Sequence, residues 1–109
     1  MDKAQALNLA RLYASEVIKE MRPERIVLYG SHAAGQAQAE SDIDVAVIFN
    51  GFTGDRHRIF TRLWTLTRRV SSFLEPILLD RADDKSGFAE EILRTGEIIY
   101  QRNVQGNEL

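Results

Sequence analysis

Two short apolar segments, joined through a glycine turn and a pair of carboxylates, constrain the fold of this chain more than any other feature. The first segment, residues 26–29, is apolar and ends at Gly30-Ser31. The second, residues 45–49, follows Asp42-Ile43-Asp44, and ten residues separate Ser31 from Asp42. β-Branched and aromatic residues favour strands, and glycine permits a sharp turn. The pattern predicts two strands, with a hydroxyl at the end of one and two carboxylates at the start of the other.

The two aspartates predict a site for a divalent cation. Side chains alternate along a strand, so Asp42 and Asp44 share one face, roughly 7 Å apart. An Asp-x-Asp on a solvated strand face would need no ligand, but here both faces of the strand continue as apolar residues. Such a strand is typically central and buried on both sides. Two carboxylates at its start repel each other unless they are protonated or joined by a cation, which favours the metal site.

The remaining segments predict one α/β domain over residues 1–109, with a small mixed sheet of three to four strands flanked by about four helices. Apolar residues spaced three and four apart predict helices, and short apolar runs predict further strands. We expect helices over 3–21, from Ser31 through the segment 32–41, over 55–72 and over 88–96; strands over 25–29, 75–80 and 98–100; and a polar tail over 103–109.

Composition excludes several classes of protein. A net charge of −2 argues against a protein that wraps nucleic acid, so no direct contact with nucleic acid is expected. The absence of cysteine excludes disulfides and zinc–thiolate sites. No apolar run approaches the roughly 20 residues that a membrane span needs, and the N-terminus lacks an apolar secretory core, so we expect a cytoplasmic protein. Gln36-Ala37 stands where a P-loop requires Lys and Ser/Thr, so that reading is rejected.

The spacing of Gly30-Ser31, ten residues and Asp42-x-Asp44 resembles the signature of the minimal nucleotidyltransferases, a branch of the DNA polymerase β superfamily. The resemblance runs from the helix before the first strand to the closing Gly-Glu-Ile-Ile-Tyr at 96–100, nearly the whole chain. It implies the nucleotidyltransferase fold, ATP as the nucleoside triphosphate substrate and two Mg²⁺ ions that support in-line attack on the α-phosphorus.

The resemblance also implies a third acid on the next strand, for which Glu75 and Asp80 are candidates. A strand–helix–strand crossover makes its two strands parallel, and parallel strands start at the same end of a sheet. Glu75 starts its strand, as Asp44 nearly starts the preceding one, whereas Asp80 lies about 16 Å farther along. The topology therefore favours Glu75. The same reasoning makes the first two strands antiparallel and brings Gly30 to the same edge.

Carried onto this chain, the resemblance gives each of these residues a role. Asp42 and Asp44 would ligate both metal ions, and Glu75 would ligate the ion that binds the attacking hydroxyl. The Gly30 N–H and Ser31 Oγ would hold the β- and γ-phosphates.

Family members often carry Arg just after Gly-Ser, where this chain has His32 and Ala34. His32 either donates a hydrogen bond to phosphate or is a surface histidine without a task. His57 is expected at the surface, and Trp64 is expected in the core, with base stacking as the alternative.

The small size resembles the antitoxin half of bacterial toxin–antitoxin pairs, whose partner is a helical HEPN-type ribonuclease. The resemblance implies transfer of AMP to a tyrosine of that partner. The chain could form a homodimer or a hetero-oligomer. Two alternatives stay open: a binding module that neutralises its partner by docking, and a stand-alone transferase that acts on a small molecule such as an aminoglycoside.

Overall fold

The computed structural model describes residues 1–38 and 40–102, so the polar tail expected over 103–109 lies outside the described residues. The elements are α1 (Lys3–Ile18), β1 (Arg25–Tyr29), β2 (Ile43–Phe49), α2 (Arg56–Thr67), β3 (Leu74–Asp80), the 3₁₀ turn η1 (Arg81–Asp83), α3 (Phe88–Thr95) and β4 (Glu97–Gln101). The strands and the helices α1, α2 and α3 follow the order expected from the sequence, but the helix expected between the first two strands does not form.

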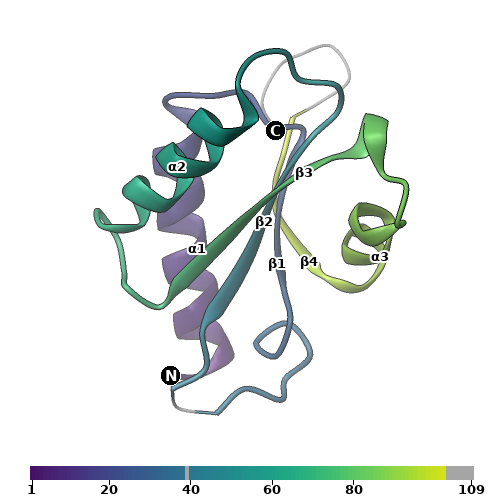
Figure 1. Ribbon diagram of the computed structural model, residues 1–109. Coiled ribbons are helices and arrows are strands. Elements are labelled where there is room, and N and C mark those ends of the chain that lie inside the picture. The colour runs from purple at the N-terminus through teal and green to yellow at the C-terminus, as the bar shows by residue number, and fades with distance from the viewer. Residues whose placement is uncertain (39, 103–109) are drawn as a thin grey trace.

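The four strands form one mixed sheet in the order β3-β2-β1-β4 (Figure 1). β1 is antiparallel to both β2 and β4, and β2 is parallel to β3. The helix α2 makes the crossover that joins the two parallel strands. The mixed sheet, the antiparallel first pair and the parallel second pair are confirmed.

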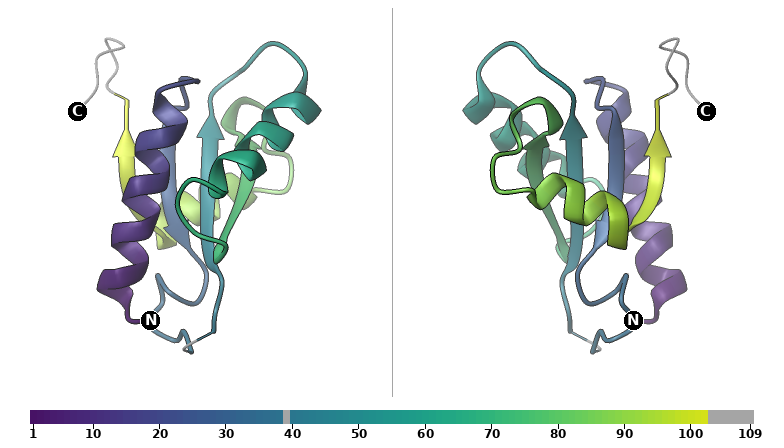
Figure 2. Two further views of the ribbon diagram at one scale, coloured as in Figure 1. Left: turned by 90° about the vertical axis from the view of Figure 1, so that its left-hand side faces the viewer. Right: turned by 90° about the vertical axis from the view of Figure 1, so that its right-hand side faces the viewer.

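Helices cover both faces of the sheet: α1 and α2 lie on one face, and the shorter α3 lies on the other (Figure 2). The larger core fills the space beneath α1 and α2 and includes Ile26, Leu28, Val45 and Val47. A smaller cluster beneath α3 contains Val27, Ala46, Ile48 and Ile92. Every residue of β2 except Asp44 is buried, so the expectation of a central, doubly covered strand is confirmed. Burying each Val, Leu or Ile contributes about 1.5–3 kcal/mol, so both clusters stabilise the sheet.

The two long helices are fixed at their ends and to each other. Asp2 and Gln5 form a capping box at the start of α1, which satisfies backbone N–H groups that the first turn leaves unpaired. Asp55 caps the start of α2. The Tyr13 hydroxyl donates a 2.7 Å hydrogen bond to the Leu63 carbonyl, which joins the two helices inside the core. No helix within the described ranges is long and apolar enough to cross a bilayer.

Four sequence-based expectations are wrong. The helix α1 ends at Ile18, not at residue 21, because the backbone then tightens, with Glu20 N–H bonded to the Val17 carbonyl. Residues 31–35 form hydrogen-bonded turns in place of the helix expected from Ser31, because Gly35 has a φ of +72° that ends the helical geometry after one turn. The helix α2 ends at Thr67, not at residue 72, because the next bonds, beginning with Arg68 N–H to the Thr65 carbonyl, are of the tighter i to i+3 type. Trp64 is 39% exposed, since its face of α2 points away from the main core.

Candidate functional site

Three polar side chains form a row across the sheet on the face that α3 partly covers. Glu75 of β3 pairs with Asp44 of β2, and Asp44 pairs with Tyr29 of β1. Adjacent strands lie about 4.8 Å apart, so these side chains are immediate neighbours. Asp80 pairs with Phe49, at the far end of the same strands. The predicted register, in which Glu75 and not Asp80 lies beside the aspartates, is therefore confirmed.

The turn after β1 brings Gly30 directly against Asp44. Gly30 has a φ of +76°, which glycine adopts without the penalty that other residues suffer. A Cβ built on Gly30 would come nearer to Asp44 Oδ2 than real Cβ contacts allow. The backbone of the turn thus occupies the space beside a carboxylate, as the spacing of the two motif halves predicts.

Negative charge accumulates in this row, and among the described residues no Lys or Arg forms an ion pair with Asp44 or Glu75. Burial, followed by the charge of Asp42, raises the pKa of Asp44. The pKa of Glu75 is raised by desolvation first, and then by the charges of Asp42 and Asp44 and by hydrogen bonding to them. Burial, followed by the charges of Asp44 and Glu75, raises the pKa of Tyr29 to about 12. Each shift shows that added negative charge is costly at this edge of the sheet.

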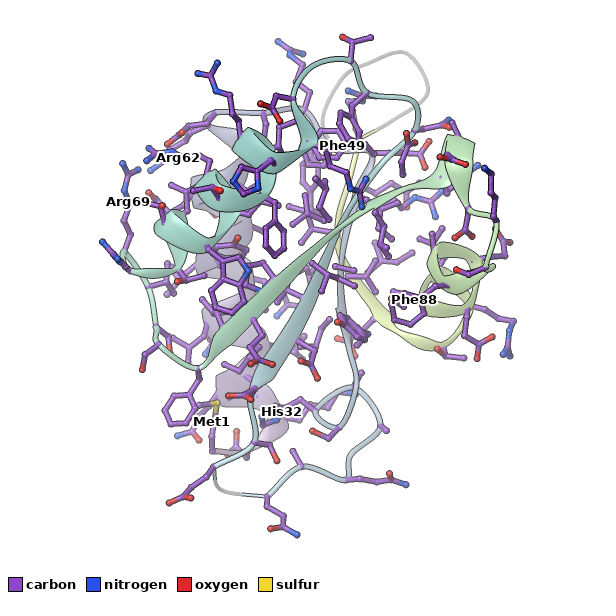
Figure 3. The ribbon with its side chains drawn as sticks, viewed as in Figure 1. Met1, His32, Phe49, Arg62, Arg69 and Phe88 are labelled. Carbon is purple, nitrogen blue, oxygen red and sulfur yellow. The ribbon has the colours of Figure 1, made fainter. Side chains whose placement is uncertain are left out.

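His32 lies inside the loop that follows Gly30, close to the carboxylates (Figure 3). Its side chain is 1% exposed, and Nε2 lies 3.2 Å from the Ser41 carbonyl oxygen. Its proximity to Asp44 partly offsets the rise in the pKa of that residue. The surface position considered for His32 is therefore wrong, because the loop folds back over the ring. His57, by contrast, is exposed as expected.

The donor set suits Mg²⁺, although the protein alone does not form a closed cage. Within residues 1–38 and 40–102, no three His, Cys, Asp or Glu side chains are grouped so that they could hold a metal ion. Mg²⁺, however, usually binds through one or two carboxylates, together with water and substrate phosphates. Asp42 and Asp44, with Glu75 beside them, supply hard oxygen donors where the raised pKa values show unbalanced charge. The residues fit a cation that arrives with a nucleotide.

Sequence reasoning overlooked two aromatic residues at the site. Tyr29 ends the row, and its ring meets that of Phe88, the first residue of α3, edge to face with centroids 6.2 Å apart. Phe88 is 45% exposed. Strand alternation alone places Tyr29 on the face of Asp44 once the β1–β2 register is known. No local signal places Phe88 there, because that depends on how α3 packs on the sheet.

Comparisons with known proteins agree with this architecture. The family model described as polymerase β, nucleotidyltransferase, matches residues 14–105. A Sulfolobus solfataricus protein described as a "putative nucleotidyltransferase" has a TM-score of 0.69 and 20% identity, covering 98% of this chain and 88% of that one. A structure described as a toxin-antitoxin with AMP-PNP has a TM-score of 0.58 and 17% identity, covering 87% and 75%. No curated protein matches the chain by sequence.

Proposed function

The chain belongs to the polymerase β nucleotidyltransferase family, and from that premise we propose that it transfers AMP from ATP to a hydroxyl group of a partner protein. The observation that carries the proposal is the row across the sheet, in which Glu75 stands beside Asp44 at the edge that also holds Gly30. A phosphate-binding turn and a set of carboxylates on one edge are what phosphoryl chemistry requires, because positioning and charge stabilisation supply most of the catalysis.

In this proposal each residue of the row has a distinct task. Asp42 and Asp44 would hold two Mg²⁺ ions, and Glu75 would supply a further carboxylate ligand to one of them. The Gly30 N–H and the Ser31 hydroxyl bind the β- and γ-phosphates and orient pyrophosphate as the leaving group. When bound, the cations supply charge neutralisation and lower the pKa of the attacking hydroxyl. The acceptor oxygen forms a bond to the α-phosphorus as the bond to pyrophosphate breaks, and the hydroxyl proton passes to solvent.

The partner that we propose is a helical HEPN-type ribonuclease, for which this chain would act as antitoxin. The likeness to a protein described as a toxin-antitoxin with AMP-PNP supports this choice.

Radiolabel transfer tests the proposal. α-Labelled ATP should pass label to the co-expressed ribonuclease only when Mg²⁺ is present, and Asp42→Asn with Asp44→Asn should stop the transfer. The double variant should still bind the partner, because docking would use other surface. Label that moves equally well in the double variant would refute the assignment of the carboxylates.

One observation favours a second candidate, a module that neutralises its partner by docking alone. Phe60 and Trp64 of α2 are 40% and 39% exposed. Their rings meet edge to face, with centroids 6.5 Å apart. Exposed aromatic pairs of this kind are enriched in protein interfaces. Neutralisation of the ribonuclease by the Asp42→Asn, Asp44→Asn variant, with no label moved, would support this candidate over the enzyme.

A further inference from the structure

The loop between β1 and β2 has to hold together two motif halves that are ten residues apart in the chain. Its hydrogen bonds form two separate local turns, one over residues 30–36 and one that joins Gln38 to Ser41. The bonds run from Ala34 N–H to the Gly30 carbonyl, from Gly35 N–H to the His32 carbonyl, from Gln36 N–H to the Ser31 carbonyl, from Ser41 N–H to the Gln38 carbonyl and from Gln38 N–H to Ser41 Oγ. None of these bonds crosses from one turn to the other.

His32 makes the crossing contact. It belongs to the first turn, and its Nε2 bonds to the backbone carbonyl of Ser41 in the second turn, next to Asp42. Among the described residues this is the one hydrogen bond that joins the two turns. A carbonyl oxygen only accepts, so Nε2 carries the hydrogen in this arrangement. With 1% of the side chain exposed, water cannot easily replace the bond.

We propose that His32 is a positioning residue that fixes the phosphate-binding turn relative to the carboxylates before nucleotide arrives. The bond fastens the segment that begins at Gly30-Ser31 to the segment that ends at Asp42. The β1–β2 ladder already pairs Tyr29 with Asp44 and sets Gly30 against that carboxylate, so the bond acts on the rest of the loop, beginning with Ser31. Without it, a bound nucleotide has to order that part of the loop. Ordering a loop on binding weakens affinity, so a preformed loop binds more tightly. This consequence for affinity rests on the proposed function, whereas the ordering of the loop does not.

A pair of substitutions at the same position separates this role from simple filling of space. In His32→Gln the side-chain amide N–H can reach about as far as Nε2 of the ring. In His32→Asn the amide is one methylene shorter, so it cannot span the same distance to the Ser41 carbonyl. Both variants introduce an amide of similar polarity and leave a smaller side chain than histidine. A role that needs only polarity or bulk predicts that the two variants behave alike.

Hydrogen exchange of the protein without ligand is the first measurement. We expect the amides of Gln36 and Ser41 to exchange about fivefold to tenfold faster in His32→Asn than in the wild type, as the loss of one net hydrogen bond allows. His32→Gln should stay close to the wild type, and the ¹⁵N shifts of the wild-type ring should show the Nε2-protonated tautomer. Equal protection in both variants, or the other tautomer, would overturn the proposal.

Steady-state kinetics with MgATP is the second measurement. The KM for ATP should rise about tenfold in His32→Asn and much less in His32→Gln, with kcat changing less than KM, because the bond acts before chemistry. An unchanged KM in His32→Asn, despite a loosened loop, would overturn the role in positioning. A wild-type protein without nucleotidyl transfer would instead refute the proposed function, and the exchange experiment would still decide whether His32 orders the loop.

Discussion

Two regions of this molecule hold carboxylates whose pKa values are shifted in opposite directions. In the turn that follows α1, Glu20 accepts two hydrogen bonds from the Arg62 guanidinium, at 2.6 and 2.7 Å. Glu16 lies 2.6 Å from Lys19 and 3.1 Å from Arg69. Hydrogen bonds from these cationic partners lower the pKa of both glutamates. At the edge of the sheet the pKa values move the other way.

The difference shows which carboxylates already have a cationic partner within the folded chain. Glu16 of α1 and Glu20, just after it, meet cations from α2 and from the segments that follow the two helices. Figure 3 shows two of these cations, Arg62 and Arg69, on the same side of the molecule. The row at the sheet edge instead brings Glu75 beside Asp44, and desolvation, followed by the charges of neighbouring carboxylates, raises the pKa of both. Clustered acids with raised pKa values mark functional sites more often than structural ones. A cation that binds from solution would neutralise the carboxylates at the sheet edge, as Lys and Arg side chains already do for Glu16 and Glu20.

The largest expected effect is on the rate of nucleotidyl transfer, when a carboxylate of the row is replaced. Glu75→Gln should reduce nucleotidyl transfer about a hundredfold or more, since it removes a charged oxygen from a site that stabilises developing charge. Asp80→Asn is the matched control, because Asp80 lies on the same strand at the far end. Release of pyrophosphate with a working acceptor measures both. The reverse ranking would place the third acid at Asp80.

This contrast between Glu75 and Asp80 also shows which features of the site can be predicted from the sequence. Strand alternation and the parallel crossover are local or topological rules, and they sufficed to place Glu75 beside Asp44. The burial of His32 could not be foreseen, because it depends on how a loop folds back on itself. The pairing of Glu20 with Arg62 joins residues 42 positions apart and depends on the packing of two helices. Patterns in sequence predicted the strands and their polar ends, whereas contacts made by loops and helix faces needed the tertiary structure.

The next largest effect should be on thermal stability, when Mg²⁺ binds with ATP and supplies positive charge to the carboxylates. Mg²⁺ and ATP together should raise the melting temperature, because a ligand that binds only the native state stabilises it by about 2.7 kcal/mol at a hundred times its Kd. Mg²⁺ alone should have a smaller effect on the melting temperature, since the described residues form no closed cage of ligands. Thermal unfolding followed by circular dichroism measures the shift. No increase with both ligands at millimolar concentration would contradict a metal–nucleotide site at this edge.

The turn that faces the carboxylates offers a matched pair of glycines. Gly30 and Gly35 have nearly the same φ, +76° and +72°, but only a Cβ at Gly30 would collide, namely with Asp44. Each substitution by alanine should cost about 1 kcal/mol of stability from backbone strain alone. Gly30→Ala should also displace the carboxylate and abolish the thermal shift by MgATP, whereas Gly35→Ala should retain it. If both variants retain the thermal shift, Gly30 is not part of the MgATP site.

The smallest effects should appear in the stability of the metal-free protein, and they should have opposite signs in the two regions. The folded-state pKa of Glu75 lies above its unfolded value, so ionisation costs stability as the pH rises through the folded pKa, and the cost is absent below the unfolded pKa. The pKa of Glu20 is lowered, so its contribution is stabilising above the unfolded pKa and is lost as the pH falls through the folded one.

At pH 7, therefore, Glu75→Gln should raise the melting temperature slightly and Glu20→Gln should lower it slightly, because both side chains are largely solvated and their interactions are screened. Both differences from the wild type should shrink as the pH falls below 4. Melting curves from pH 3 to pH 8, in EDTA and at low salt, measure the two variants side by side. A destabilised Glu75→Gln at pH 7 would mean that the fold already balances the charge at the sheet edge, and the contrast between the two regions would disappear.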